Sequence, residues 1–383
     1  MKRATLLRGL VALAVGGGVP CTAVATPTVV PSPSRAVSSG ASGAAKSAYA
    51  ALTPAQRIGQ LFMAGVSSTG PSAAKLAHLH RLGVGSVILN HNSSAGQAAV
   101  AVTTTAIATA LTTANVAPFI ATDQEGGEVQ RLSGPGFSSI PSALQQGQWA
   151  TQRLEREAAT WAGELSDAGV SLNLAPVADT VPTPHAHANQ PIGRYDREYG
   201  HTSARVGSHV AAVVRGESSH VAVTVKHFPG LGRATGNTDL TRNVTDPTAR
   251  QDPYLAPFRR GVSAGAEFAM VSLATYPHID PNRPACFSSI VIDDMLRGDL
   301  GFTGVVISDS FHAVAVRDVP PAKAAIRYFR AGGTMLLDTD ASPIREMEAA
   351  VRDRAKTHPA FAAVIKADVM DVLRAKSKAG LLS

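Results

Sequence analysis

The sequence predicts an α/β fold, and more closely a single-domain (β/α)8 barrel of the TIM type. Eight short apolar runs rich in Val, Ile, Leu and Phe recur along the chain, and most are followed by a longer segment with helical spacing. Apolar strands that alternate with helices are typical of a parallel sheet covered on both faces, and eight such units suit a closed barrel. The competing fold is a doubly wound open sheet, but no G-x-G-x-x-G or phosphate-loop sequence favours it.

The expected strands are continuous apolar runs, which is how a strand buried on both faces reads. In chain order they are Gln60–Val66, Ser86–Asn90, Pro118–Asp123, Ser171–Asp179, Val221–Phe228, Phe268–Thr275, Gly304–Asp309 and Gly333–Asp338. The segments between them repeat their apolar residues at helical spacing. They include Ala95–Ala114, Gln152–Asp167, Ser203–Glu217, Pro253–Ala264, Ser289–Leu296 and Pro321–Ala331.

Composition excludes several other classes of protein. Hydrophobic residues make up 45% of the 383 residues and charged residues 16%, which indicates a packed core rather than a disordered chain or a coiled coil. Lys and Arg outnumber Asp and Glu by 35 to 28, but they form no basic run with interleaved aromatics, so we expect no nucleic-acid partner. Two cysteines are too few for a disulfide framework or a cysteine-based zinc cluster.

The first 25 residues have the pattern of a signal peptide. Met1–Arg8 is positively charged, Leu10–Val19 is a short apolar run, and Ala23–Ala25 fits a cleavage site. We therefore expect an exported protein, either secreted or associated with the cell envelope. Cys21 leaves open a lipoprotein, tethered to the membrane through a lipid on this cysteine.

Residues 26–46 consist mainly of Pro, Ser, Gly and Ala, with almost no large apolar side chain. This composition predicts a disordered tether. A tether fits an enzyme held near a cell wall or working within it. The barrel domain is then expected to occupy residues 47–383.

Polar residues stand at the ends of several predicted strands. Asp123 and Asp179 close the third and fourth strands, Lys226 and His227 lie within the fifth, and Asp309 closes the seventh. A lone aspartate after a strand is more often a helix cap than a functional group. Because the carboxyl ends of barrel strands converge on one mouth, several such residues together predict an active site there.

Three segments of the chain resemble the signatures of glycoside hydrolase family 3. Ile120–Leu132 resembles the DQEGG-x-VQR motif, Lys226–Gly232 resembles KHFPG-x-G, and Val305–Ser310 looks like the nucleophile motif on strand seven. The pattern is closest to the β-N-acetylglucosaminidase branch, which trims bacterial cell-wall fragments. The resemblance implies a barrel enzyme that needs no metal or organic cofactor.

The resemblance also implies roles for individual residues. A retaining glycosidase needs a carboxylate nucleophile and a second group that donates and later accepts a proton. Asp309 matches the nucleophile of the family. Asp123, Arg131, Lys226 and His227 match residues that hold the sugar.

A further sugar-binding arginine is expected on the loop after strand four. The segment Ile192–Gly200 looks like the IG-x-RSFG stretch of the family with two extra residues. Matching its end selects Arg197 and matching its start selects Arg194, and we favour Arg197. Glu125, inside the first motif, is expected to be either a buried structural partner or a support for the sugar-binding residues.

The acid/base position departs from the family pattern. This branch usually has an aspartate and a histidine on the loop after KHFPG-x-G, where the present chain has Asn237 and Asp239. Three interpretations stay open. Asp239 acts as the proton donor, its pKa raised by apolar surroundings or a neighbouring carboxylate; His312 or His278 serves instead; or the protein binds sugar without turnover. We favour Asp239.

Together these features predict an exported retaining glycoside hydrolase. It would remove terminal β-linked N-acetylglucosamine from cell-wall fragments or related glycans through a covalent glycosyl-enzyme, and act as a monomer on a carbohydrate substrate. One alternative is a β-glucosidase or β-xylosidase on the same barrel. The other is a wall-sugar-binding protein without catalysis.

Overall fold

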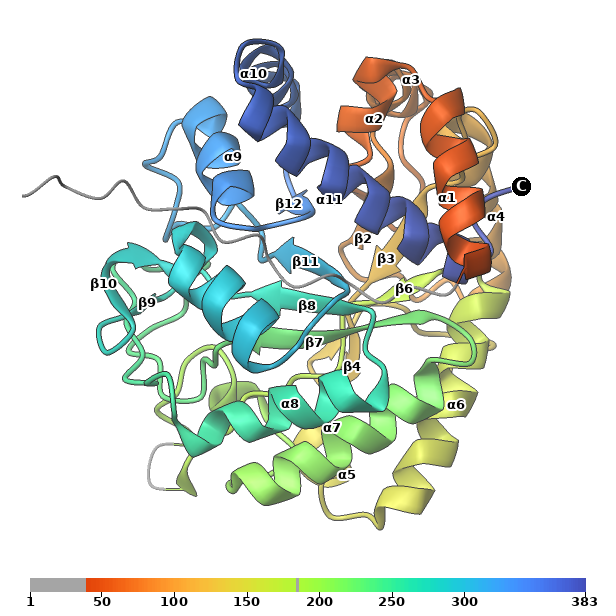
Figure 1. Cartoon of the computed structure of the whole chain (residues 1–383). Helices are drawn as coiled ribbons and strands as arrows, with labels where there is room; N and C mark the ends of the chain where they lie inside the picture. The colour runs from red at the N-terminus through yellow and green to blue at the C-terminus, as the bar shows by residue number, and fades with distance from the viewer. Residues whose placement is uncertain (1–38, 184–185) are drawn as a thin grey trace, which may run out of the picture. The chain divides into compact units, whose positions relative to one another are not determined.

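The computed structural model describes residues 39–183 and 186–383, which form a barrel of parallel strands wrapped by helices (Figure 1). The predicted signal peptide, Cys21 and the start of the predicted tether lie outside the described residues. No helix in the described ranges is long and apolar enough to cross a membrane.

The elements follow one another as the alternating pattern predicts. The barrel strands are β1 (Phe62–Ser67), β2 (Ser86–Asn90), β3 (Phe119–Thr122), β6 (Leu172–Asn173), β7 (Ala222–Phe228), β8 (Phe268–Val271), β11 (Val305–Ser308) and β12 (Leu336–Asp338). The two hairpins are β4 (Gln124–Gly126) with β5 (Val129–Gln130) and β9 (Thr275–Tyr276) with β10 (Asp280–Pro284). The α-helices are α1 (Ser39–Ala51), α2 (Pro54–Gly59), α3 (Ala73–Arg81), α4 (Gln97–Leu111), α5 (Ala143–Gln146), α6 (Thr151–Asp167), α7 (Ser203–Glu217), α8 (Ala256–Ala264), α9 (Pro321–Arg330), α10 (Ile344–Thr357) and α11 (Pro359–Lys378).

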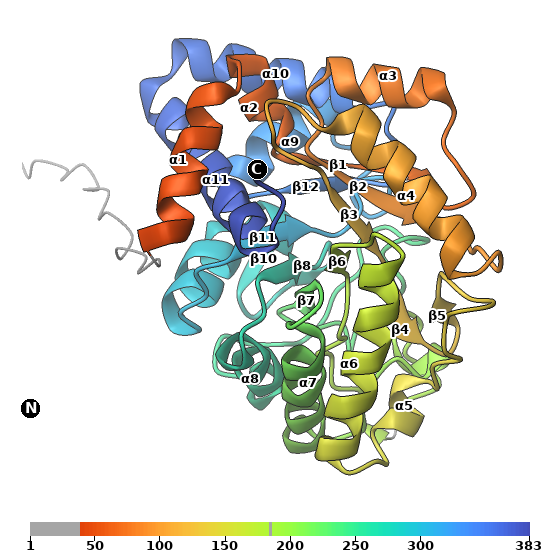
Figure 2. The ribbon, with the colours of Figure 1, turned by 90° about the vertical axis from the view of Figure 1, so that its right-hand side faces the viewer.

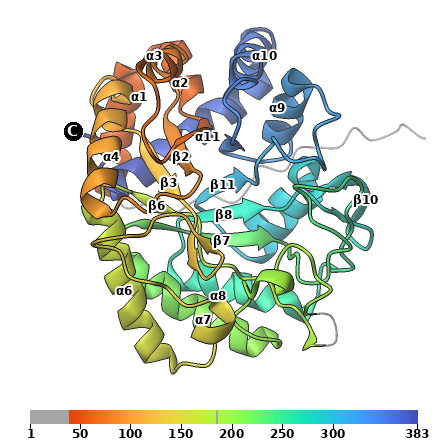
Figure 3. The ribbon, with the colours of Figure 1, turned by 180° about the vertical axis from the view of Figure 1, so that it is seen from behind.

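The eight barrel strands form one parallel sheet in the order β11-β8-β7-β6-β3-β2-β1-β12. The two end strands of this order also meet, because Ile307 and Met335 form a parallel bridge and the Ser308 amide donates to the Met335 carbonyl at 3.0 Å. The sheet is therefore closed, as predicted, and the doubly wound alternative is wrong. Seen from behind, β11, β8 and β7 run side by side in the same direction (Figure 3).

The amino-terminal end of the barrel is sealed by aromatic packing and by one buried lysine. Phe119 and Phe268, from non-adjacent strands, meet edge to face with ring centroids 5.3 Å apart. Lys376 of α11 is fully buried, and its Nζ donates to Gln60 Oε1 at 2.6 Å and to the carbonyls of Gly85 and Ala117 at 2.7 and 2.8 Å. These acceptors precede β1, β2 and β3, so the nitrogen of one lysine side chain ties α11 to the starts of three strands.

The predicted tether is wrong at its carboxyl end. The helix α1 begins at Ser39, so the last residues of the 26–46 segment are helical. Ala45 and Ala48 are buried, and α1 lies alongside α11 (Figure 2). Alanine has a high helix propensity, and its small side chain lets two helices approach closely, so a segment poor in large apolar residues still joins the domain.

Two other elements differ from their predicted form. The fourth strand was expected over Ser171–Asp179 but pairs regularly only at Leu172–Asn173, with an isolated bridge from Val177 to Lys226. Pro176 interrupts it, because proline has no amide hydrogen to give to a strand ladder. The predicted helix at Ser289–Leu296 is a π-helix, Ile290–Asp299.

We expect Lys376→Met to destabilise the barrel by about 3 kcal/mol, because it leaves three buried oxygen acceptors without their donor. Urea unfolding followed by circular dichroism measures the change. Lys378→Met, at an exposed position on the same helix, is the matched control and should change stability by less than about 0.5 kcal/mol. Equal midpoints for the two variants would contradict this role of Lys376.

Candidate active site

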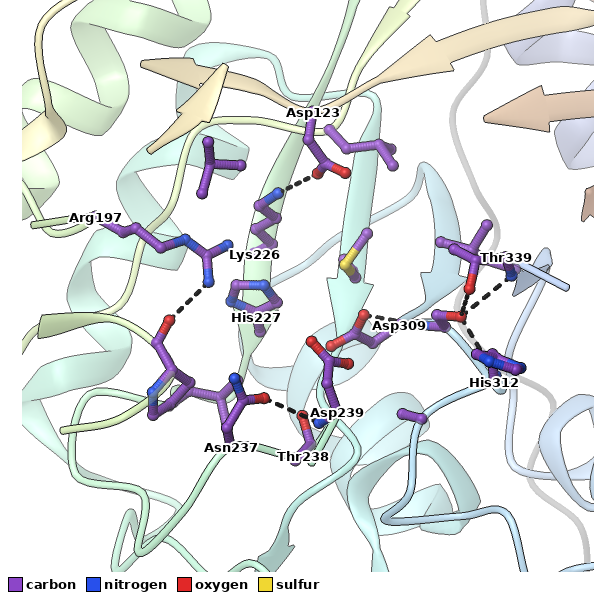
Figure 4. Close-up of a pocket in the computed structure, with 18 of the residues that line it drawn as sticks. Asp123, Arg197, Lys226, His227, Asn237, Thr238, Asp239, Asp309, His312 and Thr339 are labelled. Atoms are coloured by element: carbon purple, nitrogen blue, oxygen red, sulfur yellow. Dashed lines mark hydrogen bonds and ion pairs between the residues drawn. The ribbon is translucent and has the colours of Figure 1, made fainter. Parts of the chain in front are cut away.

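A cavity of about 480 Å³ opens at the carboxyl ends of the barrel strands (Figure 4). Its walls come from residues that follow β3, β7, β11 and β12 and from the loops beyond β5 and β6. All seven residues predicted for the site line this one cavity, namely Asp123, Arg131, Arg197, Lys226, His227, Asp239 and Asp309. Their chemical roles stay predictions.

Four charged side chains form a compact network at the base of the cavity. The Nζ of Lys226 lies 2.6 Å from both Asp123 Oδ1 and Glu125 Oε1. Arg197 binds Glu125 with two parallel bonds, Nε to Oε2 at 2.8 Å and Nη2 to Oε1 at 2.7 Å. Glu125 is therefore the centre of the network. The Asp123 side chain is 21% exposed and that of Glu125 3%, so Asp123 reaches the cavity while Glu125 supports it from below.

The network holds its members in their charged forms. Burial by itself would raise the pKa of Glu125, but the charges and hydrogen bonds of Arg197 and Lys226 outweigh it and hold that pKa well below its usual range. Burial likewise opposes the charge of Lys226, and the carboxylates of Asp123 and Glu125 raise its pKa above the ordinary value. Two anions thus compensate two cations in a site from which much of the water is excluded.

The chain turns sharply where this network meets the mouth. Gly126 and Gly127 connect β4 to β5 with φ angles of 103° and 55°. Both values lie in the left-handed region that glycine adopts without a Cβ clash. The glycines of the DQEGG motif therefore shape the hairpin that places Asp123 and Glu125.

His227 is oriented by Asp179. The His227 Nδ1 lies 2.7 Å from Asp179 Oδ2, and Asp179 Oδ1 accepts from the backbone amides of His227 and Leu231 at 3.3 and 2.8 Å. A carboxylate acceptor places the ring hydrogen on Nδ1 and leaves Nε2 for a ligand. Sequence reasoning placed Asp179 only at the end of a strand. Its partner could not be named because the two residues are far apart in the sequence, Asp179 in the loop after β6 and His227 on β7.

The carboxyl groups of Asp309 and Asp239 point toward each other within the cavity (Figure 4). Asp309 directly follows β11, and its Oδ1 accepts from the Ser310 amide at 2.8 Å. Asp239 lies on the loop after β7, where its amide donates to Asn237 Oδ1 at 2.9 Å. By its solvent-accessible area Asp239 is an exposed residue at the mouth of the cavity. The protein atoms crowded around its carboxyl still displace part of the surrounding water. This desolvation, followed by the nearby charge of Asp309, raises the pKa of Asp239 to about 6, although Arg197 and His227 oppose the shift.

The structure separates most of the alternatives that the sequence left open. Arg197 lines the cavity, whereas Arg194 is exposed and bonds Gln190. His312 lines the cavity and His278 does not. The remaining predicted residue, Arg131, donates from Nη1 to Asn92 Oδ1 at 3.0 Å at the rim.

Several cavity residues were not predicted. Glu128, Tyr195 and Arg317 also line the cavity, and all three are exposed. Nothing in the local pattern of an exposed loop distinguishes such residues from ordinary solvated ones. Within residues 39–183 and 186–383, no group of three or more His, Cys, Asp or Glu side chains is arranged to hold a metal ion.

Comparison with known proteins places this cavity in a family. The family description "Glycosyl hydrolase family 3 N terminal domain" matches residues 53–374. The chain belongs to glycosyl hydrolase family 3. The match spans the whole barrel and every residue of the charged network described above.

Named relatives agree with this assignment. The chain is 34% identical to a beta-hexosaminidase of Stenotrophomonas maltophilia over 267 residues, which cover 67% of this chain and 76% of the relative. Among solved structures it is similar to a beta-N-acetylhexosaminidase from Beutenbergia cavernae, with 43% identity, a TM-score of 0.82 and coverage of 85% of this chain and 98% of that one. A family 3 beta-N-acetylglucosaminidase from Paenibacillus sp. has 28% identity and a TM-score of 0.79, over 86% of this chain and 63% of that one.

We expect Glu125→Gln to lower the free energy of unfolding by about 3 kcal/mol, because it leaves two buried cations with one carboxylate between them. Urea unfolding measures the loss. Glu128→Gln provides the control, since Glu128 is an exposed carboxylate of the same cavity. An unchanged midpoint for Glu125→Gln would mean that Asp123 alone compensates both cations.

Proposed function

We propose that this chain is a β-N-acetylhexosaminidase, a retaining glycoside hydrolase that removes terminal β-linked N-acetylglucosamine. The observation that carries the proposal is the pair of facing carboxylates, Asp309 and Asp239, in the mouth of a family 3 barrel. The named relatives support the acetylated sugar as substrate. They also argue against the alternatives of a β-glucosidase, a β-xylosidase or a binding protein without turnover.

In the proposed mechanism Asp309 attacks the anomeric carbon and forms a covalent glycosyl-enzyme. The bond from that carbon to the leaving oxygen breaks, and Asp239 transfers its proton to this oxygen. Asp239, now a carboxylate, removes a proton from water, which attacks the anomeric carbon and releases Asp309. Such a cycle needs one carboxyl that is neutral and one that is charged at the start.

The electrostatics of the cavity support this division of roles. A carboxyl whose pKa is raised to about 6 is half protonated near that pH and serves as a general acid. The charge of Asp309 is itself one of the causes of the raised pKa, so the proposed nucleophile helps to keep the proton on Asp239 before the first step. Asp239 therefore takes the place that an Asp-His pair fills in the family pattern.

The charged network supplies the sugar-binding groups. Asp123, Lys226 and His227 line the cavity at the carboxyl ends of two strands, so their geometry is fixed before substrate arrives. Rigid donors and acceptors of this kind suit vicinal hydroxyl groups. Arg197, from the loop after β6, and Arg131, from the loop after β5, add further donors.

We further propose that the protein is exported and acts as a monomer on muropeptides of the cell wall. The signal-peptide pattern of the first 25 residues and the Pro- and Ser-rich segment after them support export. The mass of the protein purified from its host tests the idea. A chain starting at Thr26 indicates cleavage after Ala25, a lipidated Cys21 indicates anchoring, and an intact Met1 in the cytoplasm excludes both.

Asp309→Ala should reduce hydrolysis of an aryl β-N-acetylglucosaminide by about 10³-fold or more, because no nucleophile remains. Release of the phenol gives the rate, and wild type is assayed beside it on the matching β-glucoside and β-xyloside. Circular dichroism verifies that the variant is folded. A variant that keeps near wild-type turnover would show that another residue attacks the sugar, and a wild type that prefers the glucoside would move the chain to the alternative activity.

We expect kcat/KM on a substrate with a poor leaving group to fall as pH rises through about 6, because Asp239 loses the proton that it must donate. The variant Asp239→Asn should lose about 10²- to 10⁴-fold on this substrate and should no longer show this pH limb. The variant His312→Gln is the comparison. If it, and not Asp239→Asn, removes the limb, His312 is the proton donor.

A further inference from the structure

The two carboxylates of the proposed reaction sit on separate loops that touch each other. Asp239 belongs to the loop after β7, and Asp309 begins the loop after β11. Two main-chain hydrogen bonds join these loops: the Val314 amide donates to the Asp239 carbonyl at 3.3 Å and the Ala315 amide donates to the Thr238 carbonyl at 3.0 Å. The position of Asp239 therefore depends on the loop that carries Asp309.

An ion pair joins the same two loops just beyond these bonds. The guanidinium of Arg242 donates to both oxygens of the Asp318 carboxylate, Nε to Oδ2 at 2.7 Å and Nη2 to Oδ1 at 2.9 Å. The side chains are 57% and 68% exposed, and neither lines the cavity. Bidentate geometry fixes orientation as well as distance, which a single contact does not do.

The rest of the Asp239 loop is fastened at its base. The Thr235 amide donates to the Thr245 carbonyl at 2.9 Å, and the Thr245 amide donates to Thr235 Oγ1 at 3.0 Å. Arg242 stands between this base and the tip that carries Asp239. Its ion pair thus adds an anchor between the base and the tip, directed at the loop that carries Asp309.

We propose that Arg242 and Asp318 are a positioning pair, which holds the Asp239 carboxyl at the separation from Asp309 that proton transfer to the leaving group requires. This inference rests on the proposed function. Retaining glycosidases need their two carboxyls about 5–5.5 Å apart, and small misplacements of a reacting group are costly. A pair of exposed charges contributes little to global stability, so we expect its removal to change the placement of one loop and to leave the free energy of unfolding nearly unchanged.

The test compares two aryl β-N-acetylglucosaminides, one with an activated nitrophenol and one with a phenol that leaves poorly. We expect Arg242→Gln and Asp318→Asn each to lower kcat/KM about fivefold on the poor leaving group and less than about twofold on the activated one. The activated phenol departs without a proton, so only the poor one reports the placement of Asp239. The ratio kcat/KM covers the steps up to the first bond cleavage and excludes the later attack by water.

The chain offers a matched control in Arg250 and Asp299. This pair is also exposed and bidentate, with Nε to Oδ2 at 2.7 Å and Nη2 to Oδ1 at 3.0 Å, and neither residue lines the cavity. Asp299→Asn should leave kcat/KM unchanged on both substrates. The double variant Arg242→Asp with Asp318→Arg should recover most of the loss, since it restores the ion pair with its charges exchanged.

Each other outcome overturns the positioning role. Equal losses on both substrates indicate a general structural effect, and an equal loss in Asp299→Asn indicates a nonspecific effect of surface charge. Unchanged kcat/KM in Arg242→Gln and Asp318→Asn shows that the main-chain hydrogen bonds between the two loops hold Asp239 in place without the ion pair. The proposed function is tested separately by wild type: if it cleaves neither substrate, that function fails and the pair has no reaction to serve.

Discussion

The buried contact among Lys226, Glu125 and Arg197 is the constraint on which the rest of the site depends. It joins β7, the β4 hairpin and the loop after β6, three parts of the chain that are far apart in sequence. Removing charges from water is expensive, and the cost is offset only when each charge meets a partner of opposite sign with good geometry. The network therefore favours the arrangement of these three segments that pairs all of its charges, and with it the observed position of Asp123.

The two facing carboxylates, Asp309 and Asp239, lie in different electrostatic surroundings. Asp309 takes its place at the end of a rigid strand, with the Ser310 amide to support its charge. Asp239 lies on an exposed loop, where the surrounding protein atoms and the nearby charge of Asp309 raise its pKa, so its proton is held to a higher pH. The difference arises from where the two side chains are held, because the residue type is the same. A barrel with a rigid base and adjustable loops is suited to such a division.

The barrel gains its rigidity at the opposite end from the cavity. Lys376 and the edge-to-face pair of Phe119 and Phe268 seal the starts of the strands. Polar residues can then collect at the carboxyl ends without weakening the core. Separation of a stabilising face from a reactive face is a general property of this fold.

The sequence by itself determined the eight units, their order and four residues of the cavity, Asp123, Lys226, His227 and Asp309, because apolar periodicity and strand-end position are local properties of the chain. The resemblance to family 3 motifs added Arg131, Arg197 and Asp239. Tertiary structure alone decided what those residues contact. The partnership of Asp179 with His227, the central place of Glu125 and the burial of α1 depend on segments that pair only after the barrel closes. Charge compensation and desolvation act between such segments, so no local pattern records them.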